Sequence, residues 1–360
     1  PRFIDCRFLS NTAPQGGGIY GGSETAFVCH DTRFYDNSAT KGGAVYSEWL
    51  SDSVFDNCVF RENFATDGGA IYNHWEHSSV YRNCRFVANV AEEEGGAFCN
   101  PQALSGAKAR NDRAKFDRRE RKARMGDSFT SCAFDSNHAT TGGALWLAMS
   151  GFWSVQQCTF TGNSADTGGA VASVGNFDTY TGCLFHGNDA IHGSAFWWGG
   201  DGNPDPHAQP TVIGCTFVQN AATSGATVEY VDLGYWRPRL QQCIVAGNAG
   251  AAVAASGHVD LPEIACSDLA GNSGGDWTPP FDALLGQDGN ISVDPLFCAP
   301  ESGDFQLHES SPCAPGASDC GLIGALAVGC TASLFNLSGT ITDGDGQPIA
   351  EVELTGLPDP

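Results

Sequence analysis

A repeat of 26 residues constrains this chain more than any other feature of its sequence. An Asn in the pattern Phe-x-x-Asn recurs with intervals of 26 residues through the first four repeats, and it returns after an interruption with similar intervals. A fixed period of about 20–50 residues is typical of solenoids and propellers, in which each repeat forms one structural unit. The recurring Asn occupies the positions Asn11, Asn37, Asn63, Asn89, Asn137, Asn163, Asn188, Asn220 and Asn248.

Each repeat predicts three short β-strands. Cys58 and Phe60 are two residues apart and therefore lie on one face of a strand, and the same pairing recurs along the chain. Another apolar position precedes each Cys by three residues, and Gly-Gly-Ala followed by an apolar residue ends the repeat. A propeller blade needs four strands and about 40 residues, so we predict an all-β fold, a right-handed parallel β-helix of roughly ten coils.

In such a β-solenoid the recurring Asn side chains stack above one another. A side-chain amide both donates and accepts hydrogen bonds, so the nine Asn residues are expected to form a structural ladder between coils. The Cys positions of the repeat are interpreted as a buried column of small apolar side chains.

The combination of Phe-x-x-Asn with Gly-Gly-Ala-[Ile/Leu/Val] resembles the repeat of the chlamydial polymorphic outer membrane proteins and of other right-handed parallel β-helix proteins. The resemblance covers residues 1 to about 275. It implies an exported protein that is secreted or displayed on a bacterial cell surface, and such proteins are often adhesive.

Charge is unevenly distributed along the chain. The net charge of −23 argues against nucleic acid as a partner of the rod and favours solubility. Nine of the eighteen basic residues fall within 108–124, inside an insertion at about 101–128. This insertion is interpreted either as a contact for nucleic acid or an acidic surface, or as a solvated, partly disordered loop. No apolar run reaches the roughly 18 residues of a membrane span, and we expect a fragment of a longer protein because the chain begins within a repeat.

The C-terminal part departs from the repeat. Residues 276–330 resemble the closing segment of secreted β-helix proteins and are expected to form a cap, in which Cys313 and Cys320 are the nearest pair for a disulfide, although connectivity stays open. Disulfides would favour an extracytoplasmic location. Residues 331–360 alternate apolar and polar side chains around a Gly/Asp turn, resembling the start of a carboxypeptidase-regulatory-like or immunoglobulin-like module.

An aromatic stripe is the first candidate binding site. Two residues after each Gly-Gly-Ala comes a position that points away from the core if the preceding apolar residue points inward. Aromatic side chains there would suit stacking on sugar rings, and the alternative is that they stack on one another and are covered. The stripe consists of Tyr20, Tyr46, Tyr72, Trp146 and Trp197.

A second candidate is a calcium site at the turn before Gly-Gly. Asp67, Glu92 and Glu94 supply carboxylates there, and calcium prefers oxygen ligands, although solvated turn carboxylates are the preferred account of these residues. No residue is assigned a catalytic role. The leading hypothesis is therefore a non-catalytic stalk or adhesin that binds a glycan or a cell-surface protein, with a calcium-dependent lyase or hydrolase of acidic polysaccharides as the alternative. The oligomeric state is left open.

Overall fold

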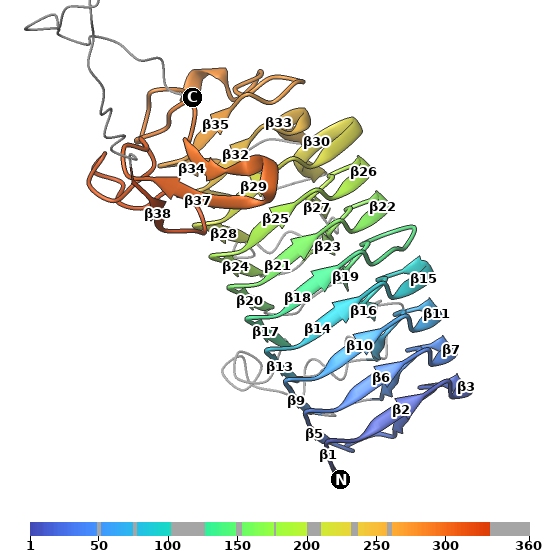
Figure 1. Cartoon of the computed structure of the whole chain (residues 1–360). Coiled ribbons are helices and arrows are strands. Elements are labelled where there is room, and N and C mark those ends of the chain that lie inside the picture. The colour runs from blue at the N-terminus through green and yellow to red at the C-terminus, as the bar shows by residue number, and fades with distance from the viewer. Residues whose placement is uncertain are drawn as a thin grey trace, which may run out of the picture.

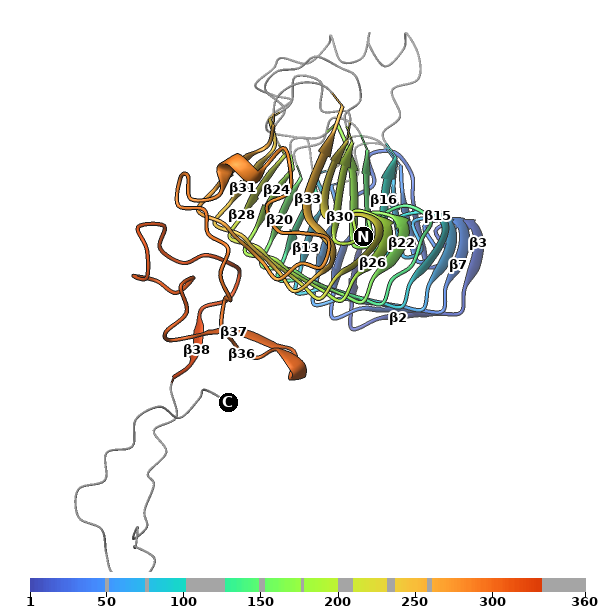
Figure 2. The same ribbon diagram turned by 90° about the horizontal axis from the view of Figure 1, so that it is seen from above.

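The computed structural model describes residues 1–48, 52–74, 78–101, 127–148, 153–175, 178–199, 210–231, 237–257 and 261–331. They form a rod of stacked coils with a separate C-terminal segment beside it (Figure 1). Seen from the C-terminal end, the chain runs counterclockwise as it approaches the viewer, so the helix is right-handed (Figure 2). The predicted right-handed parallel β-solenoid is confirmed, with ten coils counted on its two ten-stranded sheets.

Sheets A and B form two sides of the rod, and every neighbouring pair of strands within them is parallel and in register. Sheet A contains β1 (Arg2–Ile4), β5 (Val28–His30), β9 (Val54–Asp56), β13 (Val80–Arg82), β17 (Ser128–Thr130), β20 (Ser154–Gln156), β24 (Thr179–Thr181), β28 (Thr211–Ile213), β31 (Arg239–Gln241) and β34 (Glu263–Ala265). Sheet B contains β2 (Arg7–Leu9), β6 (Arg33–Tyr35), β10 (Val59–Arg61), β14 (Arg85–Val87), β18 (Ala133–Asp135), β21 (Thr159–Thr161), β25 (Leu184–His186), β29 (Thr216–Val218), β32 (Ile244–Ala246) and β35 (Asp268–Ala270).

The third side begins with a projecting element, here called the flap, which lies between each ladder Asn and the Gly-Gly turn. Its strands are β3 (Thr12–Gln15), β7 (Ser38–Lys41), β11 (Phe64–Asp67), β15 (Val90–Glu94), β22 (Ser164–Thr167) and β26 (Asp189–His192). The strands that follow the turn are β4 (Ile19–Gly21), β8 (Val45–Ser47), β12 (Ile71–Asn73), β16 (Phe98–Pro101), β19 (Leu145–Ala148), β23 (Val171–Val174) and β27 (Phe196–Gly199). Two later coils lack Gly-Gly and run straight through as β30 (Ala221–Val231) and β33 (Ala249–Ser256).

The corners of each coil are set by single residues in the left-handed backbone conformation. Asn57 separates sheet A from sheet B with φ of 54°, and Glu62 separates sheet B from the flap with φ of 55°. In the Gly-Gly turn, Gly68 has φ of 65°, whereas a Cβ on Gly69 would lie 2.2 Å from the carbonyl oxygen of Gly96 in the next coil. The first Gly therefore supplies the bend and the second lets two coils approach.

The core is built from the predicted inward columns. Phe34, Phe60 and Phe86 are buried and stack with ring centroids 4.7–4.8 Å apart. Burial raises the pKa of the Cys183 and Cys215 thiols well above its usual range, so these thiols remain protonated. The interpretation of the Cys column as buried apolar filler agrees with this environment.

The asparagine ladder is confirmed. Asn63 Nδ2 donates to Asn89 Oδ1 at 2.9 Å and to the Phe34 carbonyl at 2.9 Å, and its backbone N–H shares the same Asn89 acceptor. This pattern continues from Asn11 to Asn272, one coil beyond the predicted residues. The Asp276 carboxylate ends the ladder by accepting both donors of Asn272 at 2.8 Å.

The predicted cap has two parts with different positions. Trp277, Phe281 and Leu284 pack against the end of the core, and Phe281 is 1% exposed; the short helix η1 (Asp282–Leu284) lies here. The later part contains β36 (Phe297–Ala299), η2 (Pro300–Ser302), β37 (Asp304–His308) and β38 (Val328–Cys330). This part folds back along the outer face of sheet B, where Leu307 and Ile323 pack against Ile244 (Figures 1 and 2).

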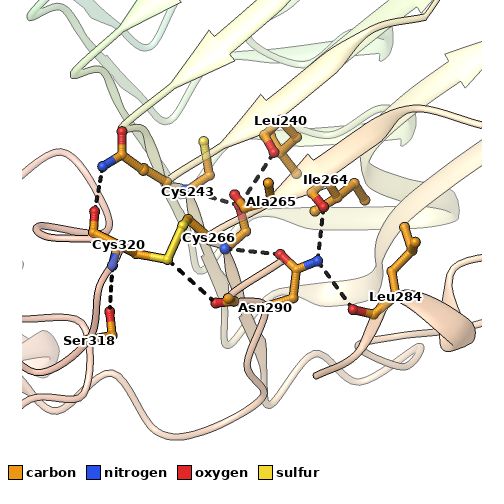
Figure 3. Close-up of a disulfide and its surroundings, with 12 residues drawn as sticks. Leu240, Cys243, Ile264, Ala265, Cys266, Leu284, Asn290, Ser318 and Cys320 are labelled. Atoms are coloured by element: carbon orange, nitrogen blue, oxygen red, sulfur yellow. Dashed lines mark hydrogen bonds between the residues drawn. A yellow bond between two sulfur atoms is a disulfide. The ribbon is translucent and has the colours of Figure 1, made fainter. Parts of the chain in front are cut away.

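The predicted Cys313–Cys320 disulfide is wrong. Cys320 is bonded to Cys266 (Figure 3). Cys298 is bonded to Cys330, and Cys313 is a buried free thiol. Cys266 takes the left-handed corner position, and Ser267 fills the inward column beside Cys243, so the Cys266 side chain is directed out of the core. The disulfide therefore fastens the last coil to the segment that folds back.

Candidate functional site

The aromatic stripe lies outside the main core, as its register predicts, but most of it is covered. Tyr20, Tyr46 and Tyr72 stack with ring centroids 5.4–5.5 Å apart. Tyr20 is 51% exposed, whereas Tyr46 is 3% and Tyr72 is 2% exposed. Trp146 is half-buried and packs with this cluster, and Trp197 is half-buried one coil beyond Ala172. The expected open aromatic surface is therefore reduced to its Tyr20 end.

The flap covers the stripe because its inner column of side chains faces the aromatic rings. Lys41 Nζ lies 4.7 Å from the centroid of the Tyr72 ring and donates to the Tyr72 hydroxyl at 3.0 Å. The same ammonium lies 3.7 Å from Asp67 Oδ2, and Asp67 is in register with Glu94 of the next coil. A cation over an aromatic face is attractive, so Lys41 holds the flap against the stripe.

Two neighbouring carboxyl groups in this column are shifted toward the neutral form. Burial raises the pKa of Asp67, with Lys41 opposing the shift, and burial together with Asp67 raises the pKa of Glu94. Burial also raises the pKa of Tyr46 to about 12. The cluster of Lys41, Asp67 and Glu94 therefore brings one cation and two carboxyl groups with raised pKa values together in a largely covered position.

The flap places the three residues of the predicted calcium site on two different sides. Glu92 is exposed and accepts a hydrogen bond from the Thr66 hydroxyl at 3.1 Å, whereas Asp67 and Glu94 belong to the inner column. Within the part of the chain that the structure describes, no group of three or more His, Cys, Asp or Glu side chains is arranged to hold a metal ion. The assignment of calcium to these three residues stays a prediction.

A buried polar network that joins the third, fourth and fifth coils was not predicted from the sequence. Asp127 is fully buried, and its carboxylate accepts from the Ser79 backbone N–H and from Asn73 Nδ2, both at 2.7 Å. Burial raises the pKa of Asp127 to about 7. A sequence signal existed, because Ser53 and Ser79 occupy this column 26 residues apart, but the insertion displaces Asp127 from the period.

A second buried carboxyl group lies farther along the rod. The Ser173 hydroxyl donates to Asp178, whose pKa is raised to about 8 by burial. Both networks are closed to solvent, so they concern stability rather than ligand binding. The basic insertion lies outside the described residues except at its ends, and residues 332–360 also lie outside them.

A pocket of about 470 Å³ lies where the folded-back segment meets sheet B. Its floor includes Val218, Ala246 and Ala270, and Asp294 and Glu301 contribute carboxylates from the cap side. Sequence reasoning did not find this pocket, because the cap was expected at the end of the rod and not along its side.

The profile of the Chlamydia polymorphic membrane protein repeat matches residues 31–48 and 57–74, which contain β6–β8 and β10–β12. The repeat is similar to that of the Chlamydia polymorphic membrane proteins. The matched segments carry the ladder Asn, the flap strand and the Gly-Gly turn, so the similarity concerns the elements that build each coil.

A search of curated proteins finds no match to this chain. Among the described residues, no helix is long and apolar enough to cross a membrane.

Proposed function

We propose that this protein is a rigid β-helical stalk or passenger, secreted or exposed on a bacterial cell surface, which binds a glycan or a surface protein without catalysing a reaction. The observation that carries the proposal is that the side chains that recur from coil to coil are buried in the core or hydrogen-bonded within the rod. Phe60 and Cys58 face the core, and Asn63 is bonded within the ladder. Partners must therefore contact side chains on the outer faces, which vary from coil to coil.

An extracytoplasmic location is supported by two independent features. The disulfide Cys266–Cys320 joins the later cap segment to the rod, and Cys298–Cys330 cross-links that segment internally. Such bonds persist in oxidising compartments. The matched repeat belongs to a family named for membrane proteins. Antibodies against the chain should label intact cells of the source bacterium, and labelling only after permeabilisation would contradict surface exposure.

Glycan binding is supported by the open end of the aromatic stripe. The Tyr20 ring is half-exposed and its hydroxyl donates to Glu48 at 2.8 Å, which fixes the orientation of the ring. A fixed aromatic surface suits stacking on a sugar ring. On a glycan array, the fluorescent chain should bind a defined subset of glycans, and Tyr20→Ala should weaken binding more than Tyr20→Phe.

A polysaccharide lyase or hydrolase is the second candidate, favoured by the neighbouring Lys41, Asp67 and Glu94. A lysine ammonium next to two carboxyl groups with raised pKa values suits proton transfer. The chain is incubated with polygalacturonate and alginate, with calcium or with a chelator, while unsaturated products and reducing ends are measured. Turnover by the wild type that Asp67→Asn abolishes would show that the protein is an enzyme and would refute the non-catalytic function. Absence of turnover under both conditions supports the non-catalytic function.

A further inference from the structure

The outer face of sheet B is divided between a covered half and an open half. The folded-back segment covers the face near β29 and β32, whereas β2, β6, β10 and β14 face solvent (Figure 1). On the open half, Arg7, Arg33, Val59 and Arg85 are aligned in one column by the parallel register. We call Arg7, Arg33 and Arg85 the arginine row.

The three guanidinium groups of the arginine row are available to a ligand. Arg7 and Arg85 are exposed and Arg33 is half-exposed. Among the described residues, none of the three has a hydrogen-bond or ion-pair partner for its side chain. In contrast, Arg61 in the adjacent column is paired with Glu62, with Nη2 and Oε1 2.7 Å apart.

Acidic side chains lie at the edges of this face and not within the row. Asp5 and Asp31 occupy the corner between sheets A and B, where Asp31 accepts a hydrogen bond from Asn57. Asp36 and Glu62 occupy the opposite corner, between sheet B and the flap. The centre of the face is therefore a cationic strip bordered by two acidic edges.

This arrangement is unfavourable for the isolated protein. Arg7 and Arg33 are direct register neighbours on parallel strands about 4.8 Å apart, and like charges in that position are destabilising. The protein carries a net charge of −23 and has only nine basic residues outside 108–124, so three of them in one column is a marked concentration. An anionic ligand would relieve the repulsion.

We propose that the arginine row binds a linear anionic polysaccharide, aligned along the rod axis over the first four coils. The charges of the row recur at about 5 Å and 10 Å along the axis, a spacing that a polymer with carboxylate or sulfate groups can meet repeatedly. Guanidinium groups bind such oxyanions through paired hydrogen bonds. The inference rests on the proposed glycan binding and names the class of glycan.

A polysaccharide is favoured over nucleic acid by the surroundings of the row. Single-stranded nucleic acids are bound through several aromatic platforms, whereas the neighbouring column offers Tyr35 alone between Leu9 and Arg61. The folded-back segment blocks the C-terminal continuation of the face, so the ligand is confined to the open coils.

The test measures binding of the full chain to immobilised heparin and polygalacturonate, with dextran as the neutral polymer, at 50 and 500 mM NaCl. The triple variant Arg7→Gln/Arg33→Gln/Arg85→Gln is compared with Arg2→Gln/Arg82→Gln/Arg239→Gln, which removes the same charge from exposed arginines of sheet A. The row variant should bind at least about tenfold more weakly and show a smaller salt dependence, while the sheet A variant should change less than about twofold.

Equal losses in both variants, or no loss in the row variant, would overturn the inference. Stronger binding to a single-stranded oligonucleotide than to either acidic polymer would identify the row as a nucleic-acid site instead. If the row variant keeps its binding to heparin and polygalacturonate while the wild type binds glycans on the array, the arginine row is refuted and the proposed function stands. Circular dichroism and thermal unfolding establish that each variant is folded.

Discussion

Replacing Asp127 with Asn is expected to stabilise the protein at neutral pH and to remove part of its pH dependence. Asp127 is fully buried, and its pKa is raised from 3.8 to about 7 mainly by burial. The folded state therefore retains a proton that the unfolded state has already lost. Because the folded pKa is the higher one, the stability contributed by this group falls as pH rises from about 4 and levels off above about 7.

The size of the effect follows from the shift. About three pKa units correspond to about 4 kcal/mol between the protonated and ionised limits, of which about 2 kcal/mol is lost between pH 5 and pH 7. The Asn side chain has no charge to bury. The Oδ1 atom of the introduced Asn can accept from the Ser79 N–H. Asn73 Oδ1 has no hydrogen-bond partner among the described residues, so a rotation of the Asn73 amide by half a turn lets it accept from the Nδ2 of the introduced Asn.

Urea unfolding of both proteins at pH 5, 6, 7 and 8 measures this difference directly. Asp178 and Asp268 also have raised pKa values, about 8 and about 6, so the quantity of interest is the difference between the wild type and the variant at each pH. We expect that difference to grow by about 2 kcal/mol from pH 5 to pH 7. Asp166→Asn, at an exposed position of the flap, is the control and should show no such trend. Parallel pH profiles of the wild type and Asp127→Asn would refute the reasoning.

Three further predictions test the ladder, the turn and the cap by urea unfolding and hydrogen exchange. Asn89→Ala leaves two buried donors of Asn63, its backbone N–H and Nδ2, without an acceptor, and should lower the free energy of unfolding by about 3 kcal/mol or more. Asn11→Ala, in the first coil, should lower it by only about 1 kcal/mol. Equal losses would contradict the ladder. Gly69→Ala places its Cβ against a backbone carbonyl and should cost more than about 3 kcal/mol, whereas Gly187→Ala meets nothing within 4 Å and should cost about 1 kcal/mol; the reverse order would contradict the close approach. Cys266→Ser removes a disulfide that spans 54 residues and whose chain-entropy contribution to stability is about 4 kcal/mol. Amide hydrogen exchange should increase in residues 291–331 and stay the same in the first coils. Unchanged exchange would show that packing alone holds the segment.

The strands and corners could be predicted because each follows from a local rule. Alternation placed Phe60 and Cys58 on one face, and the polar or Gly residues between strands indicated the bends, now seen as left-handed residues such as Asn57 and Glu62. The ladder followed from period and amide chemistry, and only its terminal Asp276 was not expected. These features depend on neighbours within a coil or one coil away.

The errors concern contacts that the repeat pattern does not report. Tyr46 and Tyr72 point away from the core as predicted, but the flap that covers them is formed by the residues just before the Gly-Gly turn, and periodicity does not report how far a turn projects. The Cys320 partner was chosen by proximity in sequence. Alignment of Ser267 with the inward column would have shown that Cys266 is one residue out of step and therefore directed outward.

The outer column of sheet B carries different side chains in the two halves of the rod. In coils one to four, the outer column of sheet B carries Arg7, Arg33 and Arg85, and the flap column carries Lys41 and Asp67. In later coils the corresponding sheet B column carries the uncharged side chains of Ala133, Thr159, Leu184, Thr216 and Ile244. The last of these are covered by the folded-back segment, and the Cys266–Cys320 bridge fixes that cover in place. Arginine therefore occurs in this column where sheet B is open and not where it is packed, because an unpaired guanidinium beneath the cap would carry a desolvation penalty. The column ends in the last coil at Asp268, a buried carboxyl group that accepts from the Val293 N–H and whose pKa is raised to about 6 by burial. The proposed ligand contact thus falls on the N-terminal coils, and structural closure falls on the C-terminal ones.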